Sequence, residues 1–228
     1  DSLFVASGES EAGAAARLGN ELADRVNEEL AAHVRDRWNV ESRLLLELER
    51  LYLRLLLPEV KHGGGGARKR YAGLVRTNDG DEVVLTGMEA VRRDWTPLAR
   101  RAQRDLFDRL FHDRDVTAYL RELVAKLRNG EFDDQLVYRK TLRRRLESYT
   151  ATTPPHVAAA RKLRGPAPRV VRYFITVNGP EPAAHRDSPI DYEHYVQRQV
   201  RGIAEPVLGI LGLEFDQVIG DDTQLRLF

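Results

Sequence analysis

The apolar residues of this chain repeat with two different periods, and this combination limits the fold more than any other feature. On one predicted helical face they recur every fourth residue, at Leu18, Leu22, Val26, Leu30 and Val34. Residues 169–177 instead alternate apolar and polar side chains, as a strand with one buried face does. The chain therefore combines helices with strands, which predicts an α+β fold.

The first part of the chain predicts strands around one long helix. A short strand is expected at residues 2–6, followed by a helix that ends near Trp38. Residues 43–57 alternate leucine with glutamate, and we expect a strand there, although the leucine content would also suit a helix. The run of four glycines at residues 63–66 predicts a flexible connection, because glycine loses the most backbone entropy on ordering.

A hairpin is predicted after the glycine run. Its strands are expected at residues 68–75 and 82–85, joined by a turn at Asn78-Asp79-Gly80. The composition then shifts near Met88–Arg93, and we place a domain boundary there.

The second part of the chain is mostly helical in pattern. One helix is expected around residues 106–111 and another at residues 116–127, between a cap at Asp115 and a stop at Asn129-Gly130. Ser188-Pro189-Ile190-Asp191 predicts a later helix with Ser188 as its cap. That helix is expected to run towards Pro206, where a further helix would begin.

The bulk composition is that of a globular protein, with 42% apolar and 31% charged residues. No apolar run approaches the roughly 20 residues that a membrane-spanning helix needs, so we expect no membrane association. The absence of cysteine suits the cytoplasm. Because the chain starts at Asp1-Ser2 without a methionine and directly at an apolar run, we expect a piece of a longer protein.

The net charge of +1 hides two strongly basic stretches. Residues 136–146 contain no acid and five cations, namely Arg139, Lys140, Arg143, Arg144 and Arg145. Residues 68–76 contain four more cations, again without an acid. Opposing charges elsewhere are screened beyond about 8 Å at physiological salt, so such stretches can bind phosphate. For residues 136–146 the alternative is a solvated helical face.

The stretch around Lys69 has the pattern of a strand that contacts DNA. Alternation would place Lys69 and Tyr71 on one face, where an ammonium and a phenol suit a phosphodiester backbone. Gly73 would permit a close approach of the backbone. The alternative is a basic edge strand that discourages aggregation.

Several segments, in the same order along the chain, resemble the family B DNA polymerases. Arg68-Lys69-Arg70-Tyr71-Ala72-Gly73 matches five of the six positions of the family's Lys-Lys-Arg-Tyr-Ala-Gly strand at the palm–thumb border. Residues 46–52 resemble its Leu-Glu-x-Glu-Lys-x-Tyr strand, and residues 87–94 its Gly-x-Glu-x-x-Arg-Arg-Asp segment. Residues 1–5 resemble the second half of its Asp-Thr-Asp-Ser motif. Matches such as Pro154-Pro155-His156-Val157 extend the resemblance to bacterial members, over the whole chain.

The resemblance implies a domain organisation and a reaction. Residues 1–91 would be the C-terminal part of a palm, with antiparallel strands and a long helix, and residues 92–228 a mostly helical thumb. The complete protein would transfer nucleotides from dNTPs to a primer 3′ end with two Mg²⁺ ions. Asp1 would be a catalytic metal ligand. Glu49, or alternatively Glu47, would be an auxiliary acid near the metals, unless it is a solvated acid on a strand.

The resemblance also implies which residues hold DNA. The primer end would be held by Lys69, Arg70, Tyr71 and Gly73. Arg92 and Arg93, with Asp94, would support the palm–thumb joint beside the DNA, unless they form ordinary surface ion pairs. The thumb would contact the minor-groove side of the duplex through Tyr138, Arg139, Lys140 and Arg143. Because the other metal ligands are not in this sequence, we expect the chain alone to be inactive.

The last five residues, Gln224-Leu225-Arg226-Leu227-Phe228, resemble the motif by which bacterial replication proteins bind the sliding clamp. Leu227 and Phe228 would enter an apolar cleft on the clamp, Leu225 a second hollow, and Gln224 would donate and accept orienting hydrogen bonds. The alternative is that this tail folds back onto its own thumb.

The expected partners are thus primer–template DNA, dNTPs in the complete protein and the sliding clamp, in the cytoplasm of a bacterium at its nucleoid. A different functional class remains open. The chain could be a non-enzymatic module that binds DNA without reading its sequence and recruits a clamp.

Overall fold

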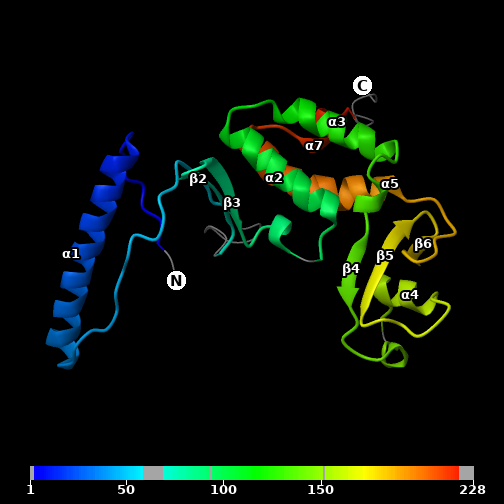
Figure 1. The fold of residues 1–228 in the computed structure, drawn as a ribbon, viewed down its shortest axis with the longest axis horizontal. Coiled ribbons are helices and arrows are strands. Elements are labelled where there is room, and N and C mark those ends of the chain that lie inside the picture. Colours follow the sequence, from blue (N-terminus) through cyan, green and yellow to red (C-terminus); the bar gives the residue numbers. More distant parts are fainter. Residues whose placement is uncertain (1–2, 59–68, 93, 151, 221–228) are drawn as a thin grey trace, which may run out of the picture. The chain divides into compact units, whose positions relative to one another are not determined.

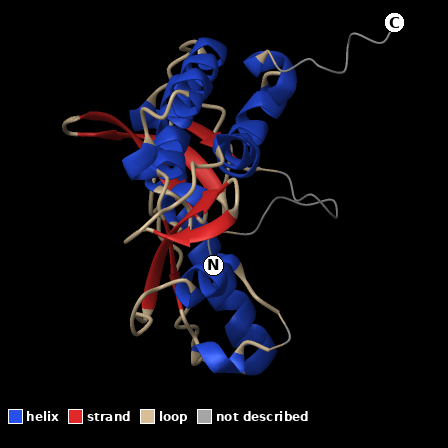
Figure 2. Ribbon diagram, turned by 90° about the vertical axis from the view of Figure 1, so that its right-hand side faces the viewer, coloured by secondary structure: helices blue, strands red, loops and turns tan. Residues whose placement is uncertain are grey.

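The structure is a computed structural model that describes residues 3–58, 69–92, 94–150 and 152–220. Helices and strands both contribute to it, as the colours of Figure 2 show, which confirms the α+β class. By their contacts the residues form two compact units. Unit 1 consists of residues 1–55 and 73–84, and unit 2 of residues 56–72 and 85–228. The predicted palm–thumb boundary at residue 91 is a different division, and it stays a prediction.

Unit 1 contains the predicted long helix, α1 (Ala12–Trp38), which Figure 1 shows in blue. The helix ends at Asn39, whose backbone is in the left-handed conformation. The apolar stripe of this helix is only partly covered. Ala15 is buried, but Leu18 and Leu22 keep 41% and 40% of their surface exposed. Periodicity therefore predicted the helix correctly but overestimated how much of its stripe is buried.

The predicted strand at residues 43–57 is wrong over most of its length, because only β1 (Arg54–Leu56) is a strand. Upstream of β1, the backbone at Leu46 is hydrogen-bonded by a side-chain amide of α1 and not by a neighbouring strand. Asn27 donates a hydrogen bond from Nδ2 to the carbonyl oxygen of Leu46 (2.9 Å), and its Oδ1 accepts one from the Leu46 N–H (2.7 Å). The strand predicted at residues 2–6 is also wrong, since residues 3–6 have no regular secondary structure.

The predicted hairpin is confirmed as β2 (Tyr71–Thr77) and β3 (Gly80–Thr86). These strands and β1 form a sheet in the order β1-β2-β3. Gly80 closes the turn with a φ of 125°, a conformation that favours glycine. The Thr77 hydroxyl donates a hydrogen bond of 2.8 Å to the Gly80 carbonyl and fixes the turn.

Unit 2 contains a group of packed helices. Its members are α2 (Pro97–Phe111), α3 (Val116–Arg128), α6 (Arg201–Ile210) and α7 (Phe215–Ile219). The Thr96 side chain caps α2 and that of Asp115 caps α3, the latter as predicted. The core between the helices is fully buried and contains Leu106, Phe107, Leu120, Leu127, Ile203 and Val207.

The start of the last long helical segment differs from the prediction. Its first turn is α5 (Tyr192–Tyr195), and Asp191 rather than Ser188 caps it by accepting a hydrogen bond from the His194 N–H (3.0 Å). A π-helical turn, η4 (Val196–Val200), then leads into α6. No new helix begins at Pro206, which lies inside α6. A proline removes one backbone hydrogen bond, and burial of the neighbouring α6 residues offsets this loss.

A second sheet in unit 2 consists of β4 (Tyr138–Thr141), β5 (Val170–Thr176) and β6 (Gly179–Pro182), all antiparallel. It confirms the predicted strand at residues 169–177. Helix α4 (Pro155–Arg161) packs against β5 and β6 (Figure 1). Short 3₁₀ turns complete the unit at η1 (Glu89–Val91), η2 (Asp133–Gln135) and η3 (Leu146–Ser148). In the described ranges, no helix is both long and apolar enough to cross a membrane.

Candidate nucleic-acid interface

Lys69 lies just before β2, and an unusual backbone conformation holds it there. It is exposed and has a φ of 68°, which few residues other than glycine adopt. Gly87 also has a positive φ, 62°, and a β-carbon on it would lie 2.0 Å from the Lys69 carbonyl oxygen. The strand alternation predicted for Lys69 and Tyr71 is therefore wrong, because β2 begins only at Tyr71. Close packing on Gly87 positions Lys69 instead.

Arg70 is engaged by an acid of the protein itself. Its Nη2 donates a hydrogen bond of 2.6 Å to Glu89 Oε1, and the side chain of Glu89 keeps only 8% of its surface exposed. Gln103 on α2 donates to the other oxygen of Glu89 (2.8 Å) and accepts from the Ala90 N–H (2.6 Å). This network joins the start of β2 to η1 and α2, so Arg70 has a structural role in addition to the predicted one.

Tyr71 is half-buried, and Gly73 is buried within unit 1. A β-carbon on Gly73 would lie 2.3 Å from Cδ1 of Tyr52, whose ring covers this glycine. The absence of a side chain at Gly73 is thus explained by packing against Tyr52. It does not require a close approach of DNA.

Arg92 and Lys140 share one carboxylate, that of Asp94. Arg92 donates from Nε (3.1 Å) and Nη2 (2.9 Å) to the two oxygens of Asp94, and Lys140 Nζ lies 3.5 Å from Oδ2. The hydrogen bond from Arg92 holds the pKa of the Asp94 carboxyl below its usual range, and Lys140 adds to this effect. Two of the predicted DNA-binding cations are therefore partly neutralised by a carboxylate between them.

Tyr138 is half-buried in an aromatic cluster. Its ring stacks on Tyr173 and Tyr195, with centroid distances of 5.3 and 5.5 Å, and its hydroxyl lies 3.0 Å from His194 Nε2. Burial raises the pKa of Tyr138 and lowers that of His194. A neutral imidazole can accept a hydrogen bond from the phenol at pH 7. Tyr138 thus connects β4 to β5 and α5.

Arg139 and Arg143 are exposed, as their predicted role requires. The segment that carries Arg139 is a strand and not a helical face. Arg143 follows β4, and its N–H donates a hydrogen bond of 3.1 Å to the Tyr149 hydroxyl. The partner of Arg139 across the sheet is Arg172, which sequence reasoning missed because strand register depends on the fold. Glu89 and Gln103 were not predicted as part of the site either, although Glu89 lies within residues 87–94, which resemble a segment of the family.

The residues that the structure describes do not by themselves fit a two-metal site. No three histidines or carboxylates among them lie close enough to hold a metal ion. Glu49 is exposed in the irregular segment of unit 1, and Asp1 lies outside the described residues. The predicted residues Arg93, Gln224, Leu225, Leu227 and Phe228 also lie outside them.

Comparisons with known proteins agree on one family. The family model described as DNA polymerase family B matches residues 1–205. DNA polymerase II of Escherichia coli K12 is 40% identical over 243 aligned residues, which cover 100% of this chain and 30% of that protein. DNA polymerase 2 of Aeropyrum pernix is 31% identical over 80% of this chain and 23% of its own length.

A solved structure shows the same relationship. The family B DNA polymerase of Pyrobaculum calidifontis superposes with a TM-score of 0.57 at 28% identity, over 82% of this chain and 25% of that one. The chain thus spans less than a third of the length of each of these three relatives.

Proposed function

Since the chain belongs to the family B DNA polymerases, we propose that it forms the part of a DNA-directed DNA polymerase that holds the primer–template duplex. The observation that carries this proposal is the 40% identity to a DNA polymerase II along the entire chain. In this proposal residues 1–91 belong to the palm and residues 92–228 to the thumb. The complete protein would act on DNA in the bacterial cytoplasm.

The exposed cations of unit 2 support a grip on DNA. Lys69 is held in a strained backbone conformation, and such strain concentrates at functional sites. Arg139 and Arg143 are exposed near the end of β4, in a stretch that contains no acid. Contacts of this kind go to phosphates and sugars, so binding would not depend on the base sequence.

The catalytic contribution of the chain would be small. Asp1 is the carboxylate that it would contribute to the Mg²⁺ ions of the complete polymerase, with Glu49 as an auxiliary acid, and the described residues form no group of three possible metal ligands. We therefore propose that the chain binds duplex DNA but does not incorporate dNTPs alone.

Primer extension tests this proposal. The 228-residue chain should bind a primer–template duplex but should not extend the primer when dNTPs and Mg²⁺ are supplied. In the complete polymerase, Lys69→Ala should raise the dissociation constant for primer–template about tenfold, the effect of losing one charged hydrogen bond. Arg104→Ala, a change of an exposed arginine on α2, is the control and should leave it unchanged. Extension by the chain alone, or failure of the chain to bind duplex, would refute the proposal.

We propose in addition that the C-terminal tail binds a sliding clamp. The support is the pattern of Gln224, Leu225, Leu227 and Phe228, because aliphatic and aromatic side chains in this spacing suit an apolar cleft. Deleting these last five residues should abolish co-purification with the clamp and leave duplex affinity unchanged. A tail of equal length made of glycine and serine should not restore it. Retained co-purification after deletion would overturn the tail assignment.

A further inference from the structure

Arg139 and Arg172 lie directly opposite each other in the second sheet. The antiparallel register of β4 and β5 pairs Arg139 with Arg172, one position along from the pair formed by Tyr138 and Tyr173. Side chains at directly opposed positions project from the same face of a sheet, with their β-carbons about 5 Å apart. The two guanidinium groups therefore start from adjacent points of one surface.

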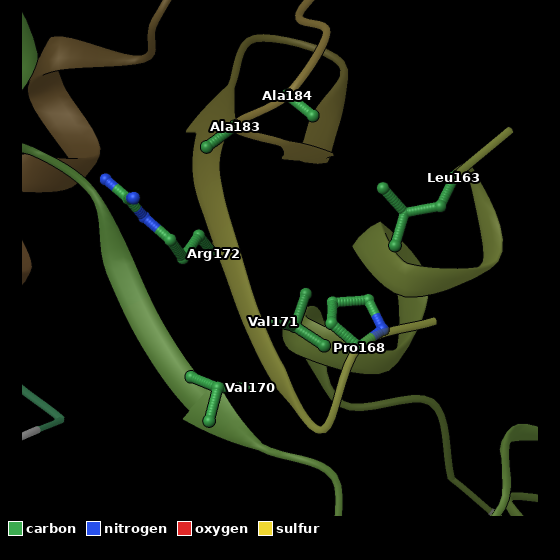
Figure 3. Close-up of a pocket in the computed structure, with 7 residues that line it drawn as sticks. All are labelled: Leu163, Pro168, Val170, Val171, Arg172, Ala183 and Ala184. Atoms are coloured by element: carbon green, nitrogen blue, oxygen red, sulfur yellow. The ribbon is translucent and has the colours of Figure 1, made fainter. Parts of the chain in front are cut away.

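This surface is the open face of the sheet. Val171 and Tyr173 form a buried cluster with Ala159 and Ala160 of α4, so α4 covers the face on which they lie. Because strand residues alternate, Arg172 projects from the opposite face. In Figure 3, Arg172 extends from one side of β5 and Val171 from the other. Both residues also border a hollow of about 420 Å³, whose other lining residues are Leu163, Pro168, Val170, Ala183 and Ala184. Thr141, Val170 and both arginines are exposed.

Neither arginine has an acidic partner within the described part of the chain. Other cations of unit 2 do have one, since Arg70 pairs with Glu89, Arg128 with Glu193 and Lys140 with Asp94. Like charges at directly opposed strand positions destabilise a sheet. An anion bound between the two guanidinium groups would remove this repulsion.

We propose that Arg139 and Arg172 together clamp one backbone phosphate of duplex DNA. This inference rests on the proposed function. It adds Arg172 to the DNA-binding residues and assigns both guanidinium groups to the same phosphate. Guanidinium groups suit the task because they stay charged at any physiological pH and donate paired hydrogen bonds to phosphate oxygens. Lys140 points to the other face of β4 and is engaged by Asp94, so it contributes less than Arg139 does.

The test compares Arg139→Gln, Arg172→Gln and the double variant in the 228-residue chain. Each single change should weaken binding of a duplex about tenfold, the effect of losing a charged hydrogen bond. The double variant should be little weaker than either single one, because both arginines hold the same phosphate. The slope of log K against log salt should become shallower by about one in all three variants.

Two matched variants serve as comparisons. Arg104→Gln removes an exposed arginine of α2 and should leave duplex binding unchanged, whereas Lys140→Gln should weaken it less than Arg139→Gln does. The thermal midpoint of unfolding in the absence of DNA provides a second readout. Both Arg→Gln changes should keep or raise it, because they remove a repulsion. A loss of affinity with a lowered midpoint would indicate misfolding and would count against the clamp.

The outcomes separate the clamp from the function on which it rests. If the unchanged chain does not bind duplex, both the proposed function and the clamp are wrong. If it binds and the single variants bind equally well, only the clamp is wrong. Effects that multiply in the double variant, with a slope change of about two, would show two separate phosphate contacts and would also overturn it.

Discussion

Arg70 and Glu89 form an ion pair at 2.6 Å, in which the Glu89 side chain keeps 8% of its surface exposed and the Arg70 side chain 40%. The pair lies within unit 2. It gives Arg70, in the basic segment 68–73, a role in stabilising the fold. Gln103 completes the hydrogen bonding of Glu89, so the carboxylate is satisfied on both oxygens. The segment just before β2 thus exposes Lys69 to solvent and is held in place by the ion pair of Arg70.

Glu89→Gln should destabilise the fold by about 1–3 kcal/mol, because it leaves Arg70 and Gln103 with a weaker, neutral partner. The midpoint of urea unfolding measures this loss. The control is Asp81→Asn, which removes the exposed partner of Arg76 and should shift the midpoint little. Equal shifts for the two variants would show that the buried pair has no special weight.

Gly73→Ala should also destabilise the chain, by about 1–3 kcal/mol, because the new methyl group would overlap the ring of Tyr52. The matched control is Gly209→Ala in α6, where a β-carbon meets nothing within 4 Å. That change should stabilise the helix by up to about 1 kcal/mol, since alanine is the better helix former. Urea unfolding distinguishes the two, and a neutral Gly73→Ala would contradict the packing explanation.

Glu181 predicts a pH dependence. Its carboxylate accepts hydrogen bonds from the Ser188 hydroxyl (2.6 Å) and from the N–H groups of Asp187 and Ser188 (2.9 and 3.0 Å). These bonds, led by that of the hydroxyl, hold the pKa of Glu181 below its usual value. The stability they contribute is therefore present above the unfolded-state pKa, about 4.3, and is lost as the pH falls through the lowered folded-state pKa.

Glu181→Gln should therefore cost about 1–3 kcal/mol at pH 7 and progressively less below about pH 4. Thermal midpoints of the two proteins between pH 7 and pH 3 measure the difference. Ser188→Ala should lose part of the same stability. A gap that stays constant down to pH 3 would contradict the assignment.

Tyr138→Phe should leave duplex affinity unchanged and lower stability by about 1 kcal/mol. The change keeps the ring stacked on Tyr173 and Tyr195 but removes the hydroxyl that contacts His194. Duplex titration and urea unfolding of the same preparation check both parts. A loss of affinity with unchanged stability would return Tyr138 to the DNA-binding set.

Local patterns predicted those elements whose stability depends mainly on near neighbours in sequence. The helix α1, the Asp115 cap of α3 and the hairpin turn at Gly80 were predicted correctly. Residues 43–52 were not, because a strand requires a partner and the side chain of Asn27 bonds Leu46 instead. Ser188 does not cap the helix, because its hydroxyl donates a hydrogen bond to Glu181 on β6.

In the candidate site, too, the sequence predicted some features and not others. The exposed positions of Lys69, Arg139 and Arg143 agree with the sequence prediction, since charged side chains rarely lose water without a partner. The partners of Arg70 and Lys140, and the pairing of Arg139 with Arg172, follow from the fold and not from spacing. A basic stretch therefore predicts a phosphate-binding surface better than it predicts which of its cations are available.

The central claim is that this chain binds the backbone of duplex DNA through its cations, and the dependence of affinity on salt tests it most directly. Dissociation constants for two duplexes of unrelated sequence should agree with each other between 50 and 200 mM salt. They should rise steeply with salt, with a log–log slope of about 0.9 for each phosphate contacted. Affinity that is insensitive to salt, or that differs strongly between the two sequences, would contradict the claim.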